Sequence, residues 1–294
     1  SGEFSDFKMD KGAIDVGLKG LVLQDKSGLR LTHLTSQLHY DSTIISLDNL
    51  KLGLYHSYIH ADYLNFKTKN GAEDWGDFMN KVRINSHLTK TKIYMSDLAY
   101  FVPDLWGVEG YLDINNVETK GPVYGMRLND LDVSLLDTTV LKGDLRIPRI
   151  NDLASAIFIE DIELFRTSVS DVEKLKLENI LNAEQTKTLN SNLAQFKSAN
   201  IITLKNGSFK GGVESFVVDG DLYTGIGNIH SDYGIQFTYQ EDGLYHYKGA
   251  LEESLGKNII VENLNLGVIT NNSLLGKVTG YLKIKGKGFD EKDL

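Results

Sequence analysis

The chain has 294 residues, of which 40 are acidic and 31 basic, so its formal net charge is −9 at pH 7. Because no cluster of Lys and Arg stands out, this balance argues against a nucleic-acid backbone or an anionic membrane surface as the main partner. The absence of cysteine excludes disulfides, zinc–cysteine sites and thiol nucleophiles.

The two ends of the sequence indicate a piece of a longer protein. The chain begins Ser-Gly-Glu-Phe without Met, and we interpret residues 1–4 as left by cloning. It ends directly after a strand-like segment. We predict a β-repeat segment over 5–150, a strand plus a helical insert over 151–200, and a second β-repeat segment over 201–294 that continues the first.

The first part of the chain alternates apolar and polar residues, which is the pattern of a half-buried strand. Strands are predicted, in order, over 14–19, 29–31, 34–40, 44–47 and 50–54. The stretch 58–66 fits poorly, because His60 and Asp62 occupy positions where apolar residues are expected; a bulge or a different face would explain this. Residues 70–77 read as a loop with a short helix.

Three segments share a closer pattern, with Gly at the second apolar-facing position and Leu at the third. They are Val108–Ile114, Leu141–Ile147 and Val278–Ile284, and each follows an Asp-Leu or Asn-Leu pair, at Asp97, Asp130 and Asn263 respectively. We interpret them as a degenerate repeat of strand pairs.

The pattern changes in the middle of the chain and then returns. Ser170 and Glu173 match a capping box, and helix-like spacing of apolar residues predicts one or two helices over about 171–196. Strands resume over 201–204, 216–222, 235–239 and 244–251, with turns expected at Asn206-Gly207 and Asp242-Gly243. Such turns favour antiparallel neighbours.

Catalytic and metal-binding patterns are weak. His56 and His60 lie near Asp62, but a strand rises about 3.3 Å per residue, so a shared metal is less favoured than solvated histidines. Asp219 and Asp221 on one strand face resemble a glycosidase pair, although a solubility role is simpler. We therefore expect no enzymatic activity, no catalytic residue, no metal site and no cofactor.

Tyrosines alternate with aliphatic residues in the last strands. We place most of them on the outer sheet face or at a rim, where ring and hydroxyl meet different media, and a sugar-binding surface is the alternative. The residues are Tyr223, Tyr245, Tyr247 and Tyr281.

A succession of short motifs resembles the TamB family, most closely its versions from Bacteroidota. The resemblance spans nearly the whole chain and depends on the order of the motifs, with the least likeness over 67–83. The motifs are Lys26–Leu29, Ile44–Leu50 with Ser57, the capped helix at Ser170, Gly207–Gly211, Phe216–Gly220, Leu222–Gly227, Tyr247–Gly249 and Lys285–Gly288.

The resemblance implies an AsmA-like, periplasm-spanning protein whose inner-membrane anchor lies outside this chain. Its fold would be mainly β: a long antiparallel, twisted sheet curled into an open groove (a β-taco), with a short helical insert around 170–197. It would conduct phospholipid between the inner and outer membranes and support outer-membrane biogenesis. The alternative is an assembly factor for outer-membrane β-barrel proteins with a BamA-type partner, and a third reading is an extracellular adhesin or glycan-binding protein.

The apolar strand faces supply the candidate groove lining, with phospholipid acyl chains, or a bound detergent, as the expected occupant and no nucleic acid as partner. The alternation of apolar and polar residues fits a sandwich or closed barrel as well as an open groove, because each of these folds has strands with one apolar face. The candidates are Ile14, Val16, Leu18, Val108, Leu112, Ile114, Leu141, Leu145, Ile147, Phe216, Val218, Leu222, Ile235, Phe237, Val278, Leu282 and Ile284.

Overall fold

The computed structural model is mainly β, and its antiparallel sheet does not close on itself. It describes residues 1–26, 28–100, 105–146, 158–179, 183, 186, 190, 197, 200–211, 215–242, 244–249, 259–269, 272–282 and 285–287. The chain divides into unit 1, residues 1–138 and 170–186, and unit 2, residues 139–169 and 187–294. The expected fold class is confirmed.

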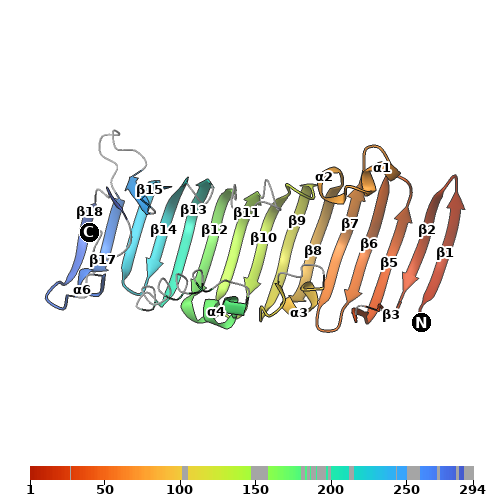
Figure 1. The fold of residues 1–294 in the computed structure, drawn as a ribbon, viewed down its shortest axis with the longest axis horizontal. Coiled ribbons are helices and arrows are strands. Elements are labelled where there is room, and N and C mark those ends of the chain that lie inside the picture. Colours follow the sequence, from red (N-terminus) through yellow and green to blue (C-terminus); the bar gives the residue numbers. More distant parts are fainter. Residues whose placement is uncertain are drawn as a thin grey trace. The chain divides into compact units, whose positions relative to one another are not determined.

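Unit 1 is a meander of antiparallel strands in the order β1-β2-β5-β6-β7-β8-β9-β10 (Figure 1). Strands β3 (Leu23–Gln24) and β4 (Arg30–Leu31) form a separate small hairpin. The main strands are β1 (Glu3–Asp10), β2 (Ala13–Lys19), β5 (His33–Tyr40), β6 (Ile44–Gly53), β7 (Tyr58–Lys67), β8 (Arg83–Tyr94), β9 (Tyr111–Pro122) and β10 (Arg127–Leu135).

Unit 2 continues with antiparallel pairs β11-β12-β13-β14-β15, after which both β16 and β17 pair with β15. β16 then pairs with β19, and β17 with β18. The strands are β11 (Thr139–Arg146), β12 (Phe158–Ser168), β13 (Ile201–Gly211), β14 (Ser215–Thr224), β15 (Gly227–Tyr239), β16 (Tyr245–Gly249), β17 (Ile259–Asn265), β18 (Lys277–Leu282) and β19 (Lys285–Lys287).

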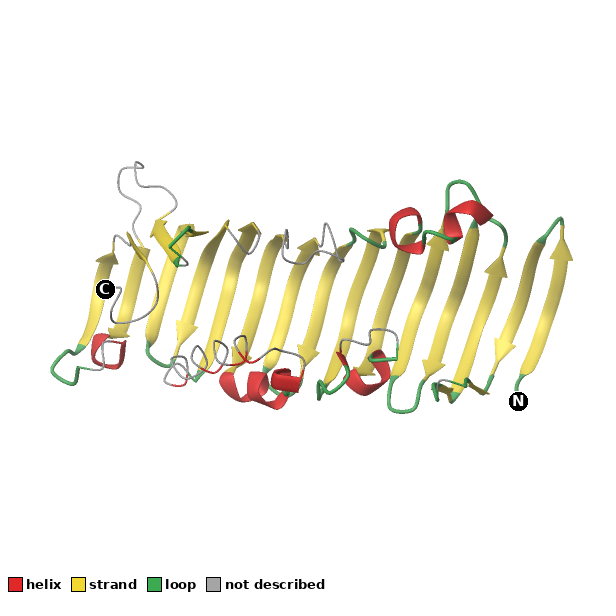
Figure 2. Ribbon diagram, viewed as in Figure 1, coloured by secondary structure: helices red, strands yellow, loops and turns green. Residues whose placement is uncertain are grey.

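The helices within the described residues are short and stand at strand ends (Figure 2). They are α1 (Ala72–Trp75), α2 (Phe78–Lys81), α3 (Met95–Leu98), α4 (Val169–Lys174), the 3₁₀ turn Leu177–Asn179, and α6 (Leu266–Ile269). The short helix expected near 70–77 is confirmed. Among the described residues, no helix combines the length and the apolar character needed to cross a membrane.

Regularly placed β-bulges interrupt the ladders. Asn49, Lys90 and Asp130 in unit 1, and Asn206 and Asn263 in unit 2, have φ between 48° and 53°, next to shifts of register. A bulge bends its strand and increases the local twist, so repeated bulges curve a sheet. The poor fit of 58–66 has this explanation: β7 is a continuous strand, and its pairing with β8 shifts on either side of Ala61.

Several local predictions are wrong. Asn206-Gly207 is not a turn, because β13 runs straight through it with Asn206 as a bulge residue. Strand β9 begins at Tyr111, not at Val108, since Gly110 has φ 111° and the Glu109 N–H donates to Leu175 O.

Two further differences concern the repeat and the helical insert. Asp97-Leu98 belongs to α3, whereas Asp130-Leu131 and Asn263-Leu264 are bulges, so the three dipeptides are not equivalent. Helix α4 begins at Val169, which places Ser170 inside the first turn and not at the cap. Most of the predicted helix over 171–196 lies outside the described residues. Strand β1 was not predicted.

Candidate functional site

Unit 1 carries continuous apolar rows across one face of its sheet. Each residue of a row is the register partner of the next. The members are half-buried, except that Val16 is buried and Tyr40 is exposed. One row is Ile14, Tyr40, Ile45, Phe66 and Ile84, and the next is Val16, Leu38, Leu47 and Leu64. The pleat places both rows on the same face.

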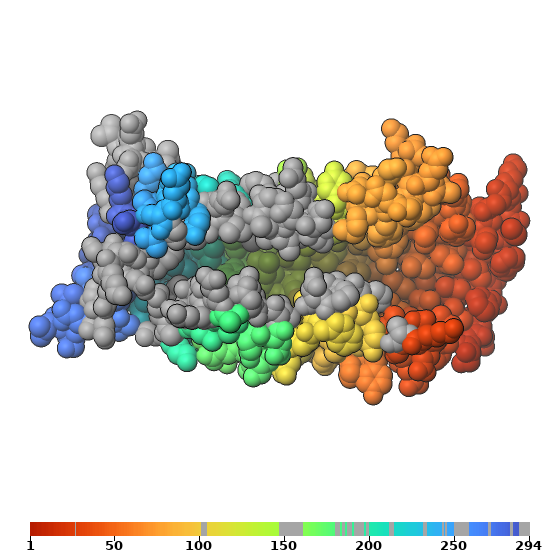
Figure 3. All heavy atoms as spheres, in the orientation of Figure 1, coloured from red at the N-terminus to blue at the C-terminus, as the bar shows by residue number. Residues whose placement is uncertain are grey.

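Short helices stand at the rims of this face. The ring of Phe78 in α2 lies 5.5 Å from that of Phe66, so α2 covers one end of the first row. At the other rim, α3 is fixed by Asp97, whose carboxylate accepts from the backbone N–H groups of His56 (2.9 Å) and Ser57 (2.7 Å). Figure 3 shows the surface of unit 1 hollowed between the orange segment that contains α1 and α2 and the yellow segment that contains α3.

Unit 2 carries an equivalent apolar row that passes through six strands. Its members are successive register partners and range from half-buried to buried, with Val261 at 2% exposure. The row is Leu141, Phe165, Leu204, Leu222, Ile229 and Val261.

An aromatic ladder lies beside this row on the same face of unit 2. Phe216 stacks on Phe209 and on Phe237, with ring centroids 5.0 and 4.9 Å apart, and Tyr247 follows at 5.9 Å from Phe237. Aromatic ladders of this geometry stabilise neighbouring strands and present a wide apolar surface. Tyr247 therefore belongs to the apolar face, whereas an outer or rim position is expected for most of the tyrosines.

The predicted lining residues fall into three groups. The first and largest group lies within β2, β9, β11, β14, β15 and β18. In this group the register places Phe216 next to Phe237 and Val218 next to Ile235. Val108 is buried in the segment before β9. Ile147 and Ile284 lie outside the described residues.

Sequence reasoning missed several members of the rows. Leu38, Leu47 and Leu64 in unit 1 and Phe165, Leu204 and Ile229 in unit 2 were not nominated, although each belongs to an alternating stretch. The alternation of apolar and polar residues around them indicates that they lie on the apolar face. Their alignment into rows depends on register, which the bulges shift.

The solvent-accessible area indicates that these faces are incompletely covered. The chain exposes 17,778 Å². A compact protein of 32.8 kDa would expose about 12,500 Å², and two separate compact bodies of half that mass about 15,000 Å². Among the described residues the other sheet is the β3–β4 hairpin, whose two-residue strands are too short to cover either apolar face. Apart from Val16, Leu204 and Val261, which are buried, the residues of the rows keep part of their apolar surface exposed.

The histidines nominated near Asp62 are not brought together as a metal site. His56 Nδ1 lies 3.5 Å from Asp97, and the backbone of His60 bonds to the Thr91 hydroxyl. Asp62 instead pairs with His87 at 2.8 Å. Within the described part of the chain, no group of three or more His, Asp or Glu is placed to hold a metal ion.

Asp219 and Asp221 each have a partner of their own on the polar face of unit 2. Ser208 donates to Asp219 at 2.7 Å, and His230 Nδ1 lies 2.9 Å from Asp221. The hydrogen bond with Asp221, and a second one with Glu262, raise the pKa of His230, while the same His230 bond lowers the pKa of Asp221. These contacts join neighbouring strands.

A small aromatic cavity of about 310 Å³ lies at the α3 rim of unit 1. Trp106 and Tyr100 meet edge to face at 5.3 Å, and Tyr55 and Arg30 also line the cavity. Trp106 is 53% exposed and Tyr55 66% exposed, which is unusual for large aromatic side chains.

No family model, no curated protein and no solved structure matches the chain. The arguments about function therefore depend on the sequence resemblance and on the geometry described above.

Proposed function

We propose that the apolar faces of both units bind phospholipid acyl chains, and that the protein conducts phospholipid between the inner and outer membranes as a TamB-like periplasmic protein. The observation that carries the proposal is the continuity of the apolar rows, such as Leu141 to Val261, without a covering layer among the described residues. A sheet that is apolar on one face buries that face against another layer or a ligand.

An acyl chain suits such a face energetically. Each methylene that leaves water contributes about 0.8 kcal/mol, so a few contacts along one row give useful affinity. Aliphatic and aromatic side chains make no directional bonds to the chain, so no single position is fixed. Weak positional preference together with substantial total burial favours movement along the rows.

The other parts of the proposal follow from the resemblance. The protein would be held by an inner-membrane anchor, would lie in the periplasm and would not be an enzyme. An assembly role for outer-membrane barrels, with a BamA-type partner, is the alternative, and it requires client strands to pair with a free sheet edge.

Native mass spectrometry of the protein purified from bacterial membranes tests lipid binding. We expect copurified phospholipid in the wild type and its loss in Leu222→Asp, because a carboxylate within the row repels acyl chains. Leu282→Asp provides a second variant at a 37% exposed position, where a charge costs little stability.

The matched control is Tyr223→Asp, which places the same charge one residue along β14 on the opposite face. Circular dichroism checks that all three variants fold. Lipid retained by Leu222→Asp and Leu282→Asp, or no lipid uptake by the wild type from liposomes, would refute the proposal.

Glycan binding is a second candidate, and the aromatic cavity at Trp106 and Tyr55 favours it. Exposed aromatic faces beside Arg30 match the stacking and hydrogen-bonding needs of a sugar ring. Trp106→Ala would abolish binding on a glycan array under this hypothesis and would leave copurified phospholipid unchanged.

A further inference from the structure

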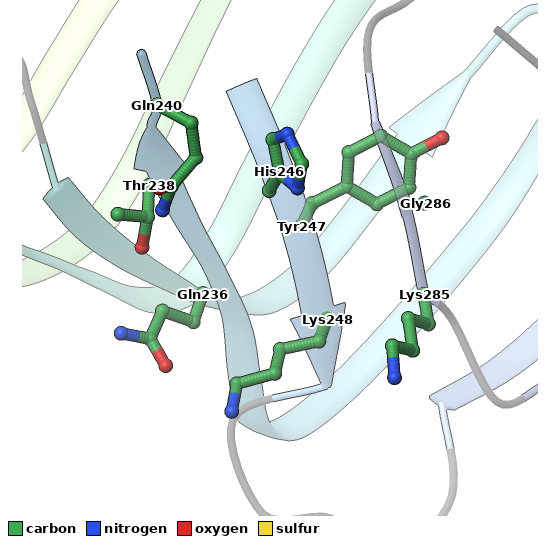
Figure 4. A pocket seen from close by; sticks show the side chains of 8 residues that line it. All are labelled: Gln236, Thr238, Gln240, His246, Tyr247, Lys248, Lys285 and Gly286. Carbon is green, nitrogen blue, oxygen red and sulfur yellow. The ribbon is translucent and has the colours of Figure 1, made fainter. Parts of the chain in front are cut away.

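A cavity of about 340 Å³ lies in unit 2 on β15, β16 and β19. Its polar side chains come from the side of the strands opposite to the aromatic ladder, and Tyr247 of the ladder also lines it. Figure 4 shows Gln236 and Thr238 on one strand, His246 and Lys248 on the next, and Lys285 on the third. Lys248 and Lys285 extend the same way in this view.

The register places basic residues opposite each other at two positions on the same face, and at one of them both residues are lysines. Lys248 is the partner of Lys285, and His246 is the partner of Lys287. Like charges directly opposite across an antiparallel pair are destabilising, so the Lys248–Lys285 pair calls for a counter-charge.

One of the two positions has a counter-charge within the protein. Asp242 lies 2.9 Å from His246 and 3.7 Å from Lys287, so one carboxylate serves both groups. At the other position, no carboxylate of the described residues forms an ion pair with Lys248 or Lys285.

We propose that Lys248 and Lys285 bind a phosphate monoester. Two ammonium groups balance the charge of nearly −2 that a phosphate monoester carries at pH 7. The amide of Gln236, the register partner of Lys248, supplies neutral N–H donors beside them. The cavity has room for the phosphate and for a small group that carries it.

The phosphate would come from a free phosphorylated molecule or from the headgroup of a phosphatidic acid. The site lies on the polar face of the sheet, so it does not depend on acyl-chain binding to the apolar face. Its failure would leave the proposed lipid function untouched, and the reverse also holds.

The test is an NMR titration of the lysine Cε–Hε resonances of the whole chain with inorganic phosphate, at constant ionic strength set by chloride. We expect saturable shifts at Lys248 and Lys285 and none at Lys287. Lys248→Gln or Lys285→Gln should weaken phosphate binding at least about tenfold, because each removes one charge-assisted contact. Lys287→Gln is the matched control and should bind phosphate as the wild type does.

A second arm uses cosedimentation with phosphatidylcholine vesicles that contain phosphatidic acid, against vesicles of phosphatidylcholine alone. Loss of cosedimentation in Lys248→Gln identifies the lipid headgroup as the source, and phosphate binding without cosedimentation identifies a free phosphorylated molecule. No binding in either arm, or equal binding by Lys248→Gln, Lys285→Gln and Lys287→Gln, would overturn the proposal.

Discussion

The two units use the same alternation of residues but differ in how many hydrophobic residues they bury. Of the sixteen buried hydrophobic residues among the described positions, twelve lie in unit 1 and four in unit 2. In unit 1 the ring of Phe78 in α2 packs against Phe66 of the first row, whereas unit 2 presents stacked rings from Phe209 to Tyr247. A helix that packs on the end of a row buries apolar surface within the protein. Apolar surface that no helix covers remains available to a ligand.

Truncation of a leucine in each unit tests this difference most strongly. Leu50 in unit 1 is 2% exposed, so Leu50→Ala should lower the free energy of unfolding by about 3 kcal/mol through lost burial and a cavity. Leu222 in unit 2 is half-buried, and Leu222→Ala should cost about 1 kcal/mol. Urea denaturation measures both losses. Equal losses would mean that unit 2 is as closed as unit 1.

The glycines of the predicted repeat give the next largest effect. Gly143 has φ 137°, and an ideal Cβ there would lie 2.1 Å from Asp161 O, so Gly143→Ala should cost about 2 kcal/mol or more. At Gly280 a Cβ would meet nothing within 4 Å, and Gly280→Ala should change stability by less than about 0.5 kcal/mol. Chemical denaturation compares the two variants, and a similar cost at both sites would show that the glycines are equivalent after all.

The smallest expected effect concerns His230 on the polar face of unit 2. Its pKa is raised by the hydrogen bonds with Asp221 and Glu262, so its stabilising contribution is complete below the unfolded value of about 6.5 and is lost as pH rises through the folded pKa. His230→Gln should therefore lower stability by up to about 1 kcal/mol at pH 5.5 and by less at pH 8.5.

Thermal unfolding at both pH values measures this difference. A gap between wild type and His230→Gln that widens toward pH 8.5 would contradict the assigned direction of the pKa shift.

The sequence predicted strand periodicity and hairpin order better than backbone detail. Alternation identifies which face is apolar, because successive side chains of a strand point to opposite faces. A turn was wrongly predicted at Asn206-Gly207 because Asn-Gly is a strong hairpin signal. An Asn in the left-handed conformation also suits a bulge inside a continuous strand, which is the role of Asn206. The residues that decide between turn and bulge lie on the partner strand.

The sequence predicts an apolar strand face as the candidate site, but it does not predict which residues of neighbouring strands join to form that face. Phe216 and Phe237 were nominated from their own strands, but the ladder that joins them to Phe209 and Tyr247 depends on register. The pairing of Lys248 with Lys285 across neighbouring strands could not be predicted either, since the two positions are 37 residues apart in the chain. Sequence periodicity also cannot say whether a layer covers the apolar face.

Quenching by brominated phospholipid tests the central claim most directly, and the absence of native cysteine makes labelling simple. A fluorescent bimane is attached at Leu222→Cys on the apolar face or at Tyr223→Cys on the polar face, and each protein is loaded with phosphatidylcholine brominated on its acyl chains. We predict strong quenching at Leu222→Cys and little at Tyr223→Cys. Equal quenching at both positions, or none at Leu222→Cys in lipid-loaded protein, would contradict binding of acyl chains to the apolar face.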